Sequence, residues 1–122
     1  MQKALVAHGL QIPRGAILYG LTALFFESEG VADGNAMLAV LGRMKPDLLV
    51  IDAELPPFGA VEAIRSARGF DSGDKKIIAI LKNSDFERAG SLRTAGAHEV
   101  IMGGYDSQKL EAKLRVLGLL QT

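Results

Sequence analysis

The chain has 122 residues, a length that suits one compact domain, and 48% of its residues are apolar. Fourteen Lys and Arg residues balance fourteen Asp and Glu residues, which argues against direct nucleic-acid binding by this domain. Cysteine is absent, so disulfides and thiolate metal sites are excluded. The longest nearly apolar stretch, residues 15–26, is too short to span a bilayer, and residues 1–7 are too short for a signal-peptide core. We therefore expect a soluble, cytoplasmic protein.

Apolar runs and helix signals alternate along the first half of the chain. Residues 3–7 form a short apolar run that is predicted as a strand, and Pro13 suits the first turn of the helix that follows. Phe25 continues the helical spacing of this helix, but residues 25–28 can instead form a brief second strand. The next helix opens at Asp33. Residues 48–52, Leu-Leu-Val-Ile-Asp, have the apolar composition of a buried strand and end in a carboxylate.

The same alternation continues in the second half. A helix is predicted over residues 59–67, and a polar loop over residues 68–74 leads to a fourth strand at residues 76–81. Ser84 is predicted to cap the fourth helix, which Gly96 ends. The last elements are a strand at residues 100–102, the glycine pair 103–104, and a helix capped by Asp106 or Ser107.

Five strand–helix units in this order predict an α/β fold built as a three-layer sandwich. Right-handed crossovers favour a flavodoxin-like, five-stranded parallel sheet with strand order 2-1-3-4-5 and five helices. The predicted domain spans residues 1–122, either as a complete protein or as a module followed by a C-terminal output domain. Asp52 lies at the carboxyl end of the third strand, where folds of this class place their ligands.

Three segments carry a resemblance in their order and spacing: Pro46–Asp52, Asp33-Gly34, and Thr94–Ala97. Together they resemble the receiver domain of bacterial response regulators. Residues 14–21 are similar to the first helix of the subfamily that carries helix-turn-helix output domains. The resemblance implies two-component signalling with a sensor kinase as partner. It also implies that the aspartate at Asp52 accepts a phosphoryl group, with Mg²⁺ held by that aspartate and an acidic pair after the first strand.

The positions that match the rest of the family's phosphorylation site depart from its pattern. Ala7 and His8 stand where the resemblance implies the acidic pair, and neither offers a good magnesium ligand. Leu81 stands in place of the hydroxyl residue at the end of the fourth strand, and Gly103 in place of the lysine at the end of the fifth. Asp52 alone is retained.

Two interpretations of Asp52 stay open at this point. Its carboxylate either caps the following loop by accepting N–H bonds or accepts a phosphoryl group as a nucleophile. His8 also has two interpretations. It either hydrogen-bonds Asp52 and responds to pH, or caps the first helix from an exposed loop.

The leading hypothesis is an atypical receiver, often called a pseudo-receiver, which is not an enzyme, needs no cofactor and signals through protein–protein contact. Its expected partner is another protein or a second copy, bound through the face of the fourth helix, fifth strand and fifth helix, with no membrane contact. This predicted face presents Glu87, Ser91, Arg93, Glu99, Gln108, Lys109 and Arg115, with Val116 and Leu119 as apolar contacts. One alternative is a phosphorylation-competent receiver that uses Asp52 with Mg²⁺ and controls a DNA-binding output domain. The other is a flavodoxin-like module that binds a small ligand.

Overall fold

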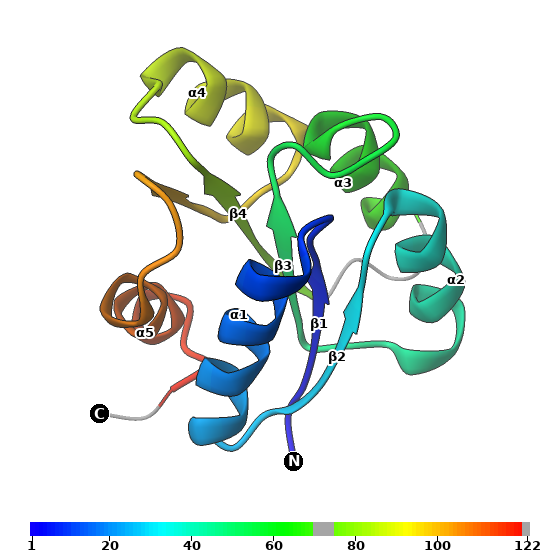
Figure 1. Cartoon of the computed structure of the whole chain (residues 1–122), viewed down its shortest axis with the longest axis vertical. Helices are drawn as coiled ribbons and strands as arrows, with labels where there is room; N and C mark the ends of the chain where they lie inside the picture. The colour runs from blue at the N-terminus through cyan, green and yellow to red at the C-terminus, as the bar shows by residue number, and fades with distance from the viewer. Residues whose placement is uncertain (70–74, 121–122) are drawn as a thin grey trace.

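The computed structural model describes residues 1–69 and 75–120 of the chain. Strands and helices alternate through these residues, as predicted (Figure 1). The strands are β1 (Lys3–Ala7), β2 (Glu27–Val31), β3 (Leu48–Asp52), β4 (Lys76–Leu81) and β5 (Glu99–Met102). The helices are α1 (Gln11–Ala23), α2 (Gly34–Met44), α3 (Ala60–Arg68), α4 (Phe86–Ala95) and α5 (Ser107–Val116).

The five strands form one parallel sheet in the order β2-β1-β3-β4-β5, which confirms the flavodoxin-like topology. Helices α1 and α5 cover one face of the sheet, and α2, α3 and α4 cover the other (Figure 1). The predicted three-layer sandwich is therefore confirmed. This arrangement follows from right-handed crossovers, because each helix must return the chain to the same end of the sheet.

The central strand β3 is apolar along almost its whole length because both of its faces are covered. Leu48 and Val50 pack in the layer with α1 and α5, whereas Leu49 and Ile51 pack in the layer with α2, α3 and α4. Asp52 is the first residue of β3 that is not fully buried. All neighbouring strands run in the same direction, so Asp52 lies at an edge where the ends of β1, β4 and β5 also meet.

Three helix boundaries are set by the residues that the sequence indicated. Asp33 caps α2 by accepting a 2.7 Å hydrogen bond from the N–H of Ala36. Asp106, rather than the alternative Ser107, caps α5 and accepts a 2.8 Å bond from the N–H of Gln108. Gly96 ends α4 with a φ of +134°, a conformation that favours glycine.

The cap of α4 lies one residue later than predicted. Asp85, and not Ser84, accepts hydrogen bonds from the N–H groups of Glu87 and Arg88, both at 3.1 Å. An aspartate caps a helix as well as a serine does, and its negative charge also interacts favourably with the helix dipole. Asp85 directly follows Ser84 in the sequence, and the path of the backbone decides which of the two side chains reaches the free N–H groups.

Strand β2 also begins later than predicted, at Glu27–Val31 instead of residues 25–28. Phe25 has a φ of +68° and its N–H donates to the carbonyl of Thr22, so it belongs to the turn that ends α1. Its neighbour Phe26 is buried. The aromatic pair favoured a strand by composition, whereas the real edge strand is rich in polar residues that protect its free edge.

The remaining boundaries differ little from the predictions. Pro13 lies in the first turn of α1, and β5 begins at Glu99, one residue earlier than predicted. The predicted loop at 68–74 starts after Arg68, which ends α3, and its residues 70–74 lie outside the described residues. Among the helices that the structure describes, none is long and apolar enough to cross a bilayer.

The contact between His98 and β4 predicts a pH-dependent stability. The Nδ1 atom of His98 accepts a 2.9 Å hydrogen bond from the N–H of Ile77. Burial lowers the pKa of His98 below its ordinary value of 6.5, and the cations Lys76 and Arg68 act in the same direction. The unfolded state therefore binds the proton more readily than the folded state, and the free energy of unfolding should fall as the pH drops below about 6.5 towards the lowered pKa.

Urea unfolding at a series of pH values between 8 and 5 measures this effect. A His98→Gln variant keeps a hydrogen-bonding side chain without a titrating imidazole, so its stability should depend less on pH over the same interval. If the free energy of unfolding changes with pH equally in the two proteins, His98 is not the cause of the pH dependence.

Candidate functional site

Asp52 lies in a partly enclosed position at the carboxyl end of β3. Its side chain is 15% exposed. The backbone N–H groups of Glu54 and Ala53 act to stabilise the charged form of the carboxylate. Burial nevertheless raises the pKa of Asp52 above its ordinary value of 3.8, although His8 and these two N–H groups act to lower it. The fold thus holds a carboxylate whose negative charge is only partly compensated.

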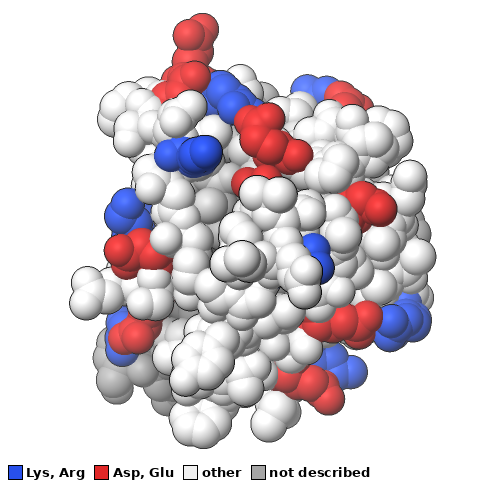
Figure 2. Space-filling model, in the orientation of Figure 1, with Lys and Arg blue, Asp and Glu red and all other residues white. Residues whose placement is uncertain are grey.

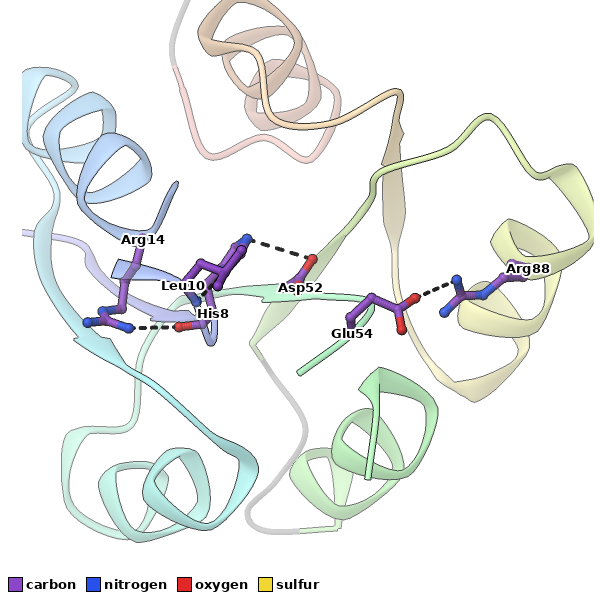
Figure 3. A network of polar contacts seen from close by, with 6 residues as sticks. All are labelled: His8, Leu10, Arg14, Asp52, Glu54 and Arg88. Atoms are coloured by element: carbon purple, nitrogen blue, oxygen red, sulfur yellow. Dashed lines mark hydrogen bonds and ion pairs between the residues drawn. The ribbon is translucent and has the colours of Figure 1, made fainter. Parts of the chain in front are cut away.

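His8 follows β1 directly and faces Asp52 across the sheet edge (Figure 3). Its Nε2 lies 3.7 Å from Asp52 Oδ1, which is too far for a hydrogen bond and leaves an electrostatic contact. Its Nδ1 accepts a 3.1 Å hydrogen bond from the N–H of Leu10. The proton of the neutral imidazole is therefore assigned to Nε2, the nitrogen beside Asp52.

The rest of the contacts of His8 fix it in place. Its carbonyl accepts a 2.9 Å hydrogen bond from Arg14 Nη1 of α1. The residue is 8% exposed, so the structure places it beside Asp52 and not in an exposed loop. A pairing of His8 with Asp52 was one of the two interpretations that the sequence left open, and the 3.7 Å distance brings the two side chains together without the hydrogen bond that this interpretation named.

A magnesium ion of the receiver type requires several hard oxygen ligands in octahedral geometry. Ala7 is fully buried and has no side-chain donor. His8 offers only imidazole nitrogens, of which Nδ1 already accepts the Leu10 N–H, whereas Mg²⁺ prefers oxygen ligands, so Asp52 is the one suitable ligand of the three. In residues 1–69 and 75–120, no group of three or more His, Cys, Asp or Glu side chains could hold a metal. The residues present do not fit the magnesium site that the resemblance implies.

On the other side of Asp52, Leu81 and Gly103 lie at the ends of β4 and β5. Leu81 is 1% exposed and packs in the core, where its side chain can form no hydrogen bond. Gly103 and Gly104 have φ values of +84° and +90°, in the left-handed region that glycine tolerates. The positions that the sequence singled out therefore do lie along the strand ends that flank Asp52.

Lys109, which the sequence assigned to the predicted interaction face, also lies close to the end of β5. Its Nζ reaches back from α5 and donates a 2.9 Å hydrogen bond to the carbonyl of Met102. The same Nζ lies 3.3 Å from the place that a Cβ on Gly103 would take, and Ser84 Oγ lies 3.9 Å from that place. A cation from α5 thus lies at the strand end where the resemblance implies a lysine of β5.

An ion pair between Glu54 and Arg88 connects the loop after β3 with α4 (Figure 3). The two charged groups approach to 2.5 Å. They border a cavity of about 420 Å³ that is also lined by Phe58, Gly59 and Leu92. No sequence motif joins Glu54 to Arg88, so this contact could not be predicted from the chain alone.

The predicted interaction face is connected by ion pairs from three elements. Glu99 of β5 contacts Lys113 of α5 at 2.9 Å and Arg93 of α4 at 3.6 Å. Burial acts to raise the pKa of Glu99, but the two cations outweigh it and hold the pKa below its ordinary value. Arg115 contacts Glu111 within α5 at 2.6 Å. Much of the charge on this face is therefore paired within the chain.

The other residues predicted for that face differ in exposure. The exposed ones are Glu87, Ser91, Gln108, Lys109 and Val116. Leu119 is partly buried and packs against the core layer of α1 and α5. The structure thus leaves Val116 as the exposed member of the two predicted apolar contacts.

Known proteins resemble this chain in sequence and in structure. The transcriptional regulatory protein TrcR of Mycobacterium tuberculosis is 30% identical over 102 residues, which cover 81% of this chain and 38% of TrcR. The DNA-binding response regulator MtrA of Mycolicibacterium paratuberculosis is 27% identical over 90 residues, which cover 74% of this chain and 39% of MtrA. The chain therefore spans about two fifths of the length of these curated relatives. No family model matches the chain.

Among solved structures, the receiver domain of the sensor histidine kinase PA1611 from Pseudomonas aeruginosa superposes with a TM-score of 0.84. The two chains are 23% identical, and the match covers 96% of this chain and 98% of that one. This likeness defines the fold as the flavodoxin-like fold of receiver domains. Together with the sequence relatives, it shows that the chain belongs to the response regulator receiver domains.

Proposed function

We propose that this receiver domain signals through protein–protein contact and lacks the normal magnesium-dependent phosphorylation cycle. The observation that carries the proposal is the contact of 3.7 Å between His8 Nε2 and Asp52 Oδ1, at the position where a receiver would hold its metal. Ala7, Leu81 and Gly103 add no metal ligand, hydroxyl or lysine around the same carboxylate.

Phosphoryl transfer depends almost entirely on positioning and on neutralising the charge of the transferred group. Around Asp52, the compensating groups are the His8 imidazole and the N–H groups of Glu54 and Ala53. These groups can orient the carboxylate, but they do not bridge it to a phosphoryl oxygen as a divalent cation would. We therefore propose that the Asp52 carboxylate has a structural role, in which it stabilises the conformation of the loop after β3.

Incubation with Mg²⁺ and acetyl phosphate, followed by intact-protein mass spectrometry, tests this proposal. We expect no gain of a phosphoryl group in the wild-type chain and the same result for Asp52→Asn. The receiver domain of PA1611, whose structure has a magnesium ion coordinated in its active site cleft, serves as the positive control. A stable mass gain that Asp52→Asn abolishes would refute the proposal.

A second candidate function is a phosphorylation-competent receiver that controls a DNA-binding output domain. It is favoured by the retained Asp52, which is partly accessible, and by the names of TrcR and MtrA, a transcriptional regulatory protein and a DNA-binding response regulator. In this case the output domain contacts DNA, because the positive and negative side chains of the receiver are equal in number and give it no basic surface excess. Both functions would operate in the cytoplasm, and the mass measurement decides between them.

A further inference from the structure

Helix α1 exposes an uncharged face that is unusual for a surface helix. Ile12, Ala16, Tyr19 and Ala23 follow one another at spacings of four, three and four residues, so they lie on one side of the helix. All four are exposed, with Ile12 at 85% and Tyr19 at 80%. The opposite side of the helix, which includes Ile17, is buried in the core. A helix that is apolar on both sides is normally covered on both sides.

The charge of α1 does not interrupt this face. Arg14 is the one charged residue among Gln11–Ala23, and its guanidinium is turned to the carbonyl of His8 at 2.9 Å (Figure 3). Figure 2, in the orientation of Figure 1, shows mostly uncharged surface over α1, with charged side chains mainly towards its margins. A charged partner would therefore lose hydration here without gaining an opposite charge.

Two more exposed apolar residues flank α1, one before its first residue and one after its last. Leu10, which precedes α1, is 65% exposed, and Phe25, which follows it, is 80% exposed. Phe25 adopts a φ of +68°, which is unusual for a bulky residue and stabilised by no burial of its ring.

The order of large and small residues makes this face complementary to itself. A two-fold axis midway between Ala16 and Tyr19 would pair two α1 helices in antiparallel orientation. Each Tyr19 would then lie against the partner's Ala16, and each Ile12 against the partner's Ala23. Large side chains thus meet small ones along the helix, as interdigitated helix packing requires.

A groove beside the helix offers space for the partner's tyrosine. It has a volume of about 470 Å³ and lies between α1 and α5, where its lining includes Ala16, Gly20, Leu24 and Tyr105. Gly20 lets the Tyr105 hydroxyl lie close against α1, because a Cβ at Gly20 would lie 2.5 Å from that hydroxyl. The lining next to Ala16 is where the two-fold arrangement brings the partner's Tyr19.

The area of the face suits a weak dimer and is smaller than that of a standard interface. Aromatic side chains bury about 150–250 Å² each, so Ile12, Tyr19, Phe25 and Leu10 together offer on the order of 500 Å² per copy. The small residues between them add to this, against roughly 800 Å² per partner in a standard interface. Exposed apolar patches of this size mark interaction sites on soluble proteins.

From these observations we infer that α1 is a homodimer interface, in which two copies of the chain pack their α1 helices antiparallel about a two-fold axis between Ala16 and Tyr19. This surface differs from the charged face of α4, β5 and α5. The inference does not depend on whether Asp52 is phosphorylated, so its test and that of the proposed function fail independently.

Sedimentation equilibrium over a range of protein concentrations is the first test. The 13.0 kDa chain should double its mass as the concentration rises. Tyr19→Glu should weaken the dimer by at least about 30-fold, the effect expected of a central aromatic residue. Val116→Glu is the matched control, because Val116 is 70% exposed on the predicted α4–β5–α5 face and should leave the dimer unchanged. Circular dichroism checks that both variants stay folded.

Cysteine cross-linking tests the orientation, because the natural chain contains no cysteine. Ile12→Cys and Ala23→Cys chains, mixed and mildly oxidised, should form a disulfide-linked heterodimer. Neither variant should cross-link with itself, since each residue and its copy would lie about 16 Å apart along antiparallel helices that rise 1.5 Å per residue.

Three results would overturn the inference. The first is a chain that stays monomeric up to about 1 mM, a concentration near the weak end of specific association. The second is a dimer that Val116→Glu dissociates and Tyr19→Glu does not. The third is a disulfide between two Ile12→Cys chains in place of the mixed product. The first result, combined with capture of a different protein by α1, would assign the face to that partner instead.

Discussion

The double substitution Ala7→Asp plus His8→Asp is expected to give the domain a magnesium-dependent stability that the natural chain lacks. Without metal, the new carboxylates lie close to Asp52, and the fully buried position of Ala7 makes an unpaired charge there costly. Mg²⁺ would neutralise the three groups with the oxygen ligands it prefers. At a concentration of 100 times its dissociation constant, it stabilises the fold by about 2.7 kcal/mol, or roughly 10 °C in melting temperature.

Thermal unfolding with and without Mg²⁺ measures this change, and calorimetric titration gives the affinity directly. The matched control is Ala7→Asn plus His8→Asn, which has similar side-chain volumes and no added negative charge. It should show no stabilisation by Mg²⁺, like the natural chain. An aspartate variant that behaves like the asparagine variant would show that positions 7 and 8 do not flank Asp52 as a metal site requires.

Truncation of Ile78 to alanine is expected to cause the largest loss of stability among single substitutions considered for this fold. Ile78 lies on the inner strand β4, is 0% exposed, and packs in the layer that joins the sheet to α1 and α5. Removal of a buried aliphatic side chain leaves a cavity and costs about 2–5 kcal/mol, a large part of the total of about 5–15 kcal/mol for a typical domain.

Urea unfolding, monitored by circular dichroism, provides the measurement. Val116→Ala is the control, because Val116 is 70% exposed and its truncation should change the free energy of unfolding by no more than about 0.5 kcal/mol. Similar losses in the two variants would contradict the assignment of Ile78 to the core between the sheet and α1.

Some elements could be predicted because local physical chemistry determines them. The strand Leu48–Asp52 was predicted with its observed bounds, since a strand covered on both faces must be apolar almost throughout. Asp33 and Gly96 were predicted as helix boundaries because a side-chain cap and a positive φ are properties of single residues. Strand β2 was misplaced, because the short, half-exposed edge strand has little apolar pattern and Phe25 resembled a strand residue by composition.

The same division holds at the candidate site. The sequence by itself determined the alternation of strands and helices, the parallel sheet, and the place of Asp52, Ala7, His8, Leu81 and Gly103 at strand ends. Only the tertiary structure decided what surrounds Asp52: the imidazole of His8 at 3.7 Å, and Lys109 turned back to Met102. It also decided that one apolar side of α1 is left exposed. Strand and helix patterns depend on neighbours along the chain, whereas these contacts and exposures depend on segments that meet only when the sheet and its helices pack.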